Sequence, residues 1–174
     1  MKTLLLLAFT FVISLTGFSQ ITVPSASPTQ TIHQDFGLAT IDLSYSRPGM
    51  KGRKIFGDLV PFGKVWRTGA NGPTTITFGD EVIIGGTKIP AGKYGLLTIP
   101  GATDWTIIIT KQLDVNNPAL YKASNDIAHV SAPVKKTANT VETFTITIDD
   151  VKQNTCALNI KWENTEVTLP VQFY

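Results

Sequence analysis

The most regular feature of the sequence is a short-range alternation of apolar and polar residues, which is typical of half-buried β-strands. Ile41, Leu43 and Tyr45, for example, alternate with polar residues. The same pattern predicts strands at 41–45, 74–78, 82–84, 87–89, 94–99, 105–110, 127–130, 144–148, 158–162 and 167–173. Turn residues separate these stretches roughly every 8–12 residues, the spacing of all-β folds. We therefore predict an all-β chain that forms a single-domain antiparallel β-sandwich, with a barrel-like closure as the alternative.

Three local signals refine this prediction. Gly85-Gly86 suits a two-residue hairpin turn, because glycine tolerates positive φ. The apolar run 107–109 predicts a strand that is buried on both faces. Residues 111–126 are the only stretch that favours helix, with Asn117 as a cap and Pro118 at the first helical position, and they are long enough for one or two turns.

The N-terminus has the pattern of an export signal. Lys2 precedes a mostly apolar stretch at 4–15, and Gly17-Phe18-Ser19 forms a small-x-small cleavage pattern before Gln20. The apolar stretch is shorter than the roughly 20 residues that span a bilayer. We expect a signal peptide (1–19), a flexible lead-in (20–31) and the β-sandwich domain (32–174). The mature chain, without a membrane span, is then periplasmic or extracellular.

Residues 46–71, here called the basic loop, break the strand pattern. Their glycines and prolines prevent a long helix, and apolar residues lie between their charges. The six cations of the loop face a single anion, Asp58; they are Arg47, Lys51, Arg53, Lys54, Lys64 and Arg67. A loop of this length is usually functional or disordered, and the apolar residues argue against disorder.

We identify the candidate ligand-binding residues in this loop. They are Arg47, Lys51, Arg53, Lys54, Trp66, Arg67 and Asn71. Arginine matches carboxylates and phosphates with two parallel hydrogen bonds, so an anionic small molecule or an acidic glycan is the expected partner. Two alternatives stay open: the arginines brace the loop against the sheet, and Trp66 is a core residue instead of a platform for a sugar ring or a cation. Asn71 also fits a turn.

Composition narrows the function classes. The 174 residues carry a formal net charge of only +2, which argues against nucleic acid as a partner. Cys156 is the only cysteine, so no disulfide forms within the chain, and we expect it to be a small buried residue. His33 and His129 lie far apart and lack metal-ligand spacing, although Asp35 and Asp126 lie near them in sequence. We expect no metal and no cofactor.

Several uncommon segments resemble the family called "domain of unknown function 2911", whose members are exported bacterial proteins. The resemblance runs from about residue 31 to the C-terminus. It is carried by residues 45–48, 51–57, 60–71 and 90–94, that is, YSRP, KGRKIFG, VPFGKVWRTGAN and PAGKY. The resemblance implies export and a single β domain, and it implies no catalytic residues.

Three functions therefore remain. The first is a non-enzymatic exported domain that binds an anionic or carbohydrate-like ligand through the basic loop. The second is a structural or protein-interaction module of the bacterial envelope, in which the loop braces the fold or docks on a protein partner. The third is a hydrolase, which the sequence favours least because no nucleophile with a base and no catalytic motif can be identified.

Overall fold

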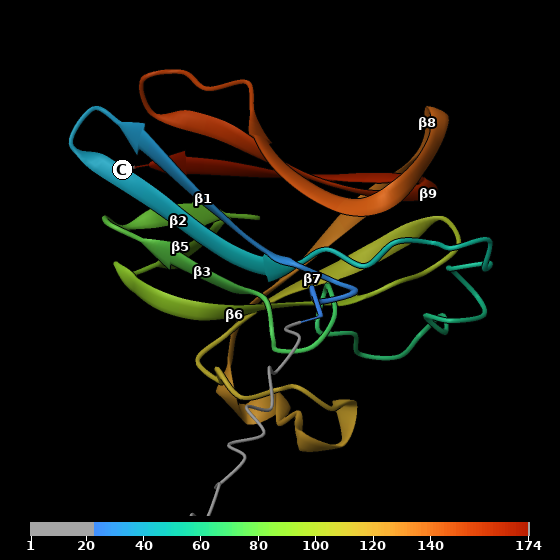
Figure 1. Cartoon of the computed structure of the whole chain (residues 1–174). Helices are drawn as coiled ribbons and strands as arrows, with labels where there is room; N and C mark the ends of the chain where they lie inside the picture. Colours follow the sequence, from blue (N-terminus) through green and yellow to red (C-terminus); the bar gives the residue numbers. More distant parts are fainter. Residues whose placement is uncertain (1–22, 174) are drawn as a thin grey trace, which may run out of the picture.

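The structure is a computed structural model that describes residues 23–173, and its strands form two layers (Figure 1). The nine strands of this part of the chain are β1 (Thr29–Phe36), β2 (Ala39–Ser46), β3 (Thr75–Phe78), β4 (Val82–Ile84), β5 (Thr87–Ile89), β6 (Gly92–Ile99), β7 (Asp104–Thr110), β8 (Asp126–Asp149) and β9 (Thr155–Phe173). Two 3-10 turns, η1 (Pro118–Leu120) and η2 (Ala123–Asn125), lie between β7 and β8. The predicted signal peptide lies outside the described residues.

The two sheets share strand β8. The first sheet has the order β1-β2-β3-β6-β7 followed by the start of β8, and the second continues from β8 through β9 and β4 to β5. Pro133 of β8 still pairs with Asp104 of β7, whereas the next residue, Val134, pairs with Val167 of β9. All neighbouring strands are antiparallel, and β1 and β5 remain as open edges. The all-β sandwich is therefore confirmed, and the sheets do not close into a barrel.

The core follows from the alternation in the sequence. In β2 the side chains of Ile41, Leu43 and Tyr45 are buried, while the polar residues between them are half-buried. The run 107–109 is buried on both faces, as predicted. Ile108 points away from the main core and packs in a second, small cluster, because residues 111–125 cover the outer face of the first sheet at this point.

The region between β7 and β8 also follows the sequence. Asn117 caps η1, since its side chain accepts a hydrogen bond from the backbone of Ala119 at 3.0 Å, and Pro118 is the first residue of the turn. We call residues 111–125 the cover segment. Its ends meet, because the N–H of Lys111 donates to the carbonyl of Asn125 at 2.9 Å. None of the helices in residues 23–173 is long and apolar enough to cross a bilayer.

Three features differ from the expectations. Strand β1 begins at Thr29, inside the stretch that we expected to be a flexible lead-in, and it pairs with the whole of β2. Its sequence is mostly polar because it is an edge strand with one exposed face. Strands β8 and β9 are each continuous where we expected two separate strands. Their polar middle parts stay extended because the two strands pair with each other across the step between the sheets.

Candidate functional site

The basic loop leaves β2 and returns to β3, and its apolar residues are built into the main core. Ile55, Phe56, Val60 and Trp66 are all buried. The ring of Phe56 lies edge-on to three tryptophan rings, the nearest being that of Trp105 at 4.9 Å between centroids. The loop is therefore a fixed part of the fold, and the core interpretation of Trp66 is correct for most of its side chain.

Hydrogen bonds fix the tip of the loop. The N–H of Val60 donates to the carbonyl of Ile55 at 2.9 Å, and the N–H of Gly57 donates to the carbonyl of Val60 at 3.0 Å. The carboxylate of Glu163, on β9, accepts the N–H groups of Ile55 and Phe56 at 3.4 and 3.3 Å. Glu163 was not predictable, because nothing in the sequence shows that β9 comes close to this turn.

Two of the predicted binding arginines brace the loop. Arg47 donates from Nε to the carbonyl of Phe144 at 3.2 Å and from Nη2 to the hydroxyl of Thr145 at 3.0 Å. Arg53 donates from Nε and Nη2 to the carbonyls of Met50 and Gly49 at 2.9 and 2.8 Å. For these residues the geometry supports the bracing alternative, since each guanidinium already donates two hydrogen bonds to groups of the protein itself.

The other cations of the loop are less engaged. Within residues 23–173, the ammonium groups of Lys51, Lys54 and Lys64 have no hydrogen-bond or ion-pair partner. Arg67 donates from Nη1 to the carbonyl of Asn116 at 3.4 Å, and its Nε is buried without a partner. These four side chains retain hydrogen-bond donors that are not used within the described part of the chain.

A cavity of about 490 Å³ lies between the basic loop and the cover segment. Trp66 and Trp162 form its aromatic wall, and Arg53, Lys64 and Arg67 supply the charged groups. The remaining lining residues are mostly apolar: Ser27, Pro48, Leu59, Val60, Pro61, Val65, Gly69, Ala70 and Pro118. No carboxylate lines the cavity, so it can hold a negative group next to an apolar body.

Of the seven predicted ligand-binding residues, the structure brings Arg53, Trp66 and Arg67 to this cavity. Arg47 and Lys51 line a separate hollow of about 300 Å³ beside Glu142. Lys54 and Asn71 line neither of the two. The side-chain N–H of Asn71 donates to the carbonyl of Ser27 at 3.0 Å, and its φ of 57° fits the turn interpretation.

Several residues of the cavity wall are not among the predicted ligand-binding residues. Lys64 and Val65 lie in the basic loop and could have been included on charge and position. Trp162, on β9, and Pro118, in the cover segment, come from distant parts of the chain, and the sequence carries no signal that joins them to the loop.

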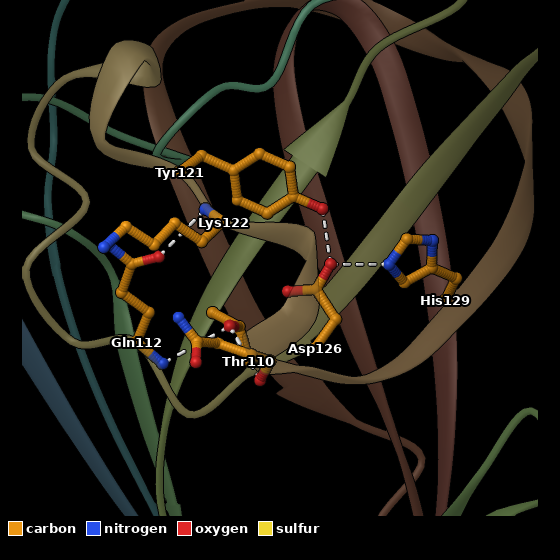
Figure 2. Close-up of polar contacts among 7 residues, drawn as sticks. Thr110, Gln112, Tyr121, Lys122, Asp126 and His129 are labelled. Atoms are coloured by element: carbon orange, nitrogen blue, oxygen red, sulfur yellow. Dashed lines mark hydrogen bonds and ion pairs between the residues drawn. The ribbon is translucent and has the colours of Figure 1, made fainter.

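A second polar cluster lies on the outer face of the first sheet (Figure 2). The side chain of Asp126 is only 5% exposed, and its Oδ2 accepts hydrogen bonds from the hydroxyl of Tyr121 and from Nε2 of His129, the latter at 2.7 Å. The other carboxylate oxygen, Oδ1, is buried without a partner. Burial, and then the hydrogen bond to Asp126, raise the pKa of Tyr121 to about 12.

A bulge in β8 creates this cluster. Ala128 pairs with Ile109, but the next pair joins Asp126 to Thr110, so Ile127 is an extra residue. Because side chains alternate along a strand, the extra residue turns Asp126 to the face that carries His129. The cover segment then brings Tyr121 over the carboxylate.

Both histidines are therefore paired with the acids that lie near them in sequence. Nδ1 of His33 contacts Asp42 at 2.6 Å, and Nε2 contacts Asp35 at 3.1 Å. The hydrogen bond that His33 donates to Asp42 is the largest cause of the raised pKa of His33. Neither His33 nor His129 lines the large cavity, which gives no support to a hydrolase at that site. In residues 23–173 no three metal-ligating side chains are arranged to hold an ion.

With this geometry established, the comparison with known families is decisive for ancestry. Residues 27–171 match a family described as a protein of unknown function, DUF2911. The chain belongs to this family. The match covers every strand of the DUF2911 fold, from β1 into β9, and also the basic loop and the cover segment, so the cavity is part of the family domain. No curated protein and no solved structure matches the chain.

Proposed function

We propose that this DUF2911 protein is an exported, non-enzymatic binding protein that takes a small amphiphilic anion into the cavity between the basic loop and the cover segment. The observation that carries the proposal is the lining of the cavity, which combines Trp66, Trp162 and aliphatic walls with Arg53, Lys64 and Arg67 and includes no carboxylate. Its volume is in the range of small-molecule sites, about 300–1,000 Å³.

The polar groups of the wall favour a carboxylate or phosphate on an apolar body over a sugar. Sugar hydroxyls need acceptors as well as donors, but Ser27 is the only side chain in the lining that can accept. The indole N–H of Trp66 is already used, since it donates to the carbonyl of Gly69 at 3.0 Å. Arg67, in contrast, keeps an unused buried donor at Nε. Of the two ligand classes expected from the sequence, the acidic glycan is therefore less well supported than the anionic small molecule.

Calorimetry and thermal shift test this proposal. The probes are a medium-chain fatty acid, an aromatic carboxylate, inorganic phosphate and an acidic oligosaccharide. A ligand at 100 times its Kd stabilises the fold by about 2.7 kcal/mol, a clear shift in Tm. We expect the fatty acid or the aromatic carboxylate to bind, and phosphate alone and the oligosaccharide to bind poorly.

The matched variants are Arg67→Gln, in the cavity, and Lys152→Gln, in the exposed β8–β9 turn. Arg67→Gln should weaken binding at least tenfold, because a charged hydrogen bond contributes about 1.5–3 kcal/mol, and Lys152→Gln should have no effect. The proposal fails if neither amphiphile raises Tm at saturation, or if Arg67→Gln binds as well as the unchanged chain. Mass spectrometry of the processed N-terminus in cell fractions tests export separately, with cleavage expected between Ser19 and Gln20.

The bracing role is a second candidate, supported by Arg47 and Glu163. Both hold the loop through backbone groups and neither lines the cavity. Arg47→Ala should lower the stability of the fold without changing ligand affinity. Loss of affinity in parallel with stability would favour an envelope module in which the loop has a structural role alone.

A further inference from the structure

The tip of the basic loop exposes apolar side chains. Leu59 and Phe62 are 45% and 44% exposed, and Phe62 is the one aromatic side chain in residues 23–173 that stands out as exposed. Buried neighbours on both sides, Phe56, Val60 and Trp66, show that the loop could have hidden more of its apolar surface. Large exposed apolar groups rimmed by polar ones often mark an interaction surface.

These side chains are held in place before any partner binds. The ring of Phe62 lies over Gly57, where a Cβ would come within 2.9 Å of a ring carbon, and the φ of Gly57 is +86°. The N–H of Gly63 donates to the carbonyl of Pro100 at 2.8 Å, which fixes the chain on the other side of Phe62. A pre-organised tip loses little conformational entropy when it binds.

Cations outnumber anions at the tip. Lys51, Lys54 and Lys64 carry ammonium groups without partners among the described residues, and Asp58 is the single carboxylate of the loop. Lysine acts as a mobile point charge with no fixed geometry, in contrast to the rigid fork of arginine. This arrangement is complementary to a diffuse negative surface.

We propose that the tip of the basic loop, residues 51–64, docks on a lipid bilayer that carries anionic headgroups. Leu59 and Phe62 enter the interfacial region, and Lys51, Lys54 and Lys64 lie at the level of the phosphates. A small apolar patch with surrounding lysines suits a bilayer, which offers both an apolar layer and dense negative charge. A stable protein interface usually takes about 800 Å² from each partner, more than two half-exposed side chains provide.

The docking surface adjoins the cavity, because Leu59 and Lys64 belong both to the tip and to the cavity wall. If the proposed function holds, an amphiphilic anion could pass between bilayer and cavity without crossing bulk water. The docking itself does not depend on that function.

Vesicle co-sedimentation tests the docking. The predicted signal peptide would bind vesicles through its own apolar stretch, so the assay uses the chain that starts at Gln20 and contains the whole described fold. We expect binding to vesicles of phosphatidylcholine mixed with phosphatidylglycerol, weak binding to phosphatidylcholine alone, and loss of binding as salt rises.

Variants locate the contact. Each neutralised lysine should lower partitioning about fivefold, so Lys54→Gln with Lys64→Gln should lower it roughly 25-fold. Phe62→Ser should lower it about fivefold, because roughly half of a phenylalanine is transferred. The matched controls are Leu38→Ser, in the turn between β1 and β2, and Lys152→Gln, in the turn between β8 and β9. In Figure 1 these turns lie on the opposite side of the sandwich from the basic loop, so both variants should leave binding unchanged.

A second readout does not depend on affinity. Bromine-labelled acyl chains should quench the tryptophan fluorescence of the Phe62→Trp variant. They should not quench the fluorescence of the tryptophan introduced by Leu38→Trp. Equal binding to both vesicle types, no binding at low salt, or equal losses in the tip and control variants would overturn the proposal. Arg67→Gln should still dock, so a failure of ligand binding and a failure of docking remain distinguishable.

Discussion

The basic loop and the cover segment both extend from the first sheet and both reach the wall of the cavity, but they are held by different forces. The basic loop buries four apolar side chains in the main core, among them Phe56 and Trp66. The cover segment buries only Val115, against a small cluster, and is otherwise held by polar contacts such as that of Tyr121 with Asp126. Apolar burial is insensitive to pH, whereas contacts of ionisable groups are not, so the two segments should respond to different conditions.

The largest effect should come from the apolar attachment. Phe56→Ala removes a ring that contacts three tryptophans, and it should lower the free energy of unfolding by about 3–5 kcal/mol. Val115→Ala in the cover segment should cost about 1–2 kcal/mol, because it removes less volume from a smaller cluster. Urea unfolding at fixed pH measures both. Similar losses for the two variants would contradict the proposed difference in attachment.

The next effect should come from the polar attachment. Asp126→Ala leaves the hydroxyl of Tyr121 and Nε2 of His129 without their acceptor, which should lower the free energy of unfolding by about 1–3 kcal/mol. Asp114→Ala, an exposed acid in the same segment, serves as the control and should change stability by less than about 0.5 kcal/mol. Hydrogen exchange should become faster in residues 111–125 and stay unchanged in the basic loop. Faster exchange in both would show that the two segments are coupled.

A smaller effect should appear as a pH dependence of the polar attachment. The pKa of Tyr121 rises from 10.0 to about 12 on folding, so its contribution is complete below pH 10 and is lost as the pH rises toward 12. Tyr121→Phe should cost about 1 kcal/mol at neutral pH, and the difference from the unchanged chain should shrink as the pH rises above 10. Burial also raises the pKa values of Tyr45 and Tyr94, so only the difference between the two chains isolates Tyr121. A difference that stays constant with pH contradicts the assignment.

The smallest effect should come from the polar contacts of the basic loop itself. Arg53→Ala removes hydrogen bonds to two carbonyls on an exposed surface, and we expect a loss of about 0.5–1 kcal/mol. Lys54→Ala, whose ammonium has no partner among the described residues, should stay within about 0.5 kcal/mol of the unchanged chain. Denaturation midpoints measure both variants. A larger loss for Lys54 than for Arg53 would mean that charge, and not bracing, holds the loop.

The sequence predicted most of the sandwich because its core strands alternate clearly. The pattern at Ile41, Leu43 and Tyr45 matches the burial in β2. The alternation did not predict β1, because β1 is an edge strand with an exposed face and needs no apolar alternation. The sequence predicted β8 and β9 each as two shorter strands for a similar reason. Pairing between the two strands keeps polar residues extended where the sequence shows no alternation.

The candidate site was predictable as a segment but not residue by residue. Charge and glycine content located the basic loop, and Arg53, Trp66 and Arg67 do line a cavity. Which arginine faces the cavity depends on long-range register: Arg47 turns to Phe144 because the chain after β2 runs beside β8. Pro118 reaches the wall only through the path of the cover segment. The cluster around Asp126 likewise depends on a one-residue bulge, which no local pattern predicts.

The sharing of β8 between the sheets has a consequence for how the fold comes apart. Residues 126–133 belong to one layer and residues 134–149 to the other, with no break in the backbone between them. Neither sheet can unfold without disturbing the part of β8 that belongs to the other, so this strand couples the unfolding of both sheets. The two sheets should therefore unfold together as one cooperative unit.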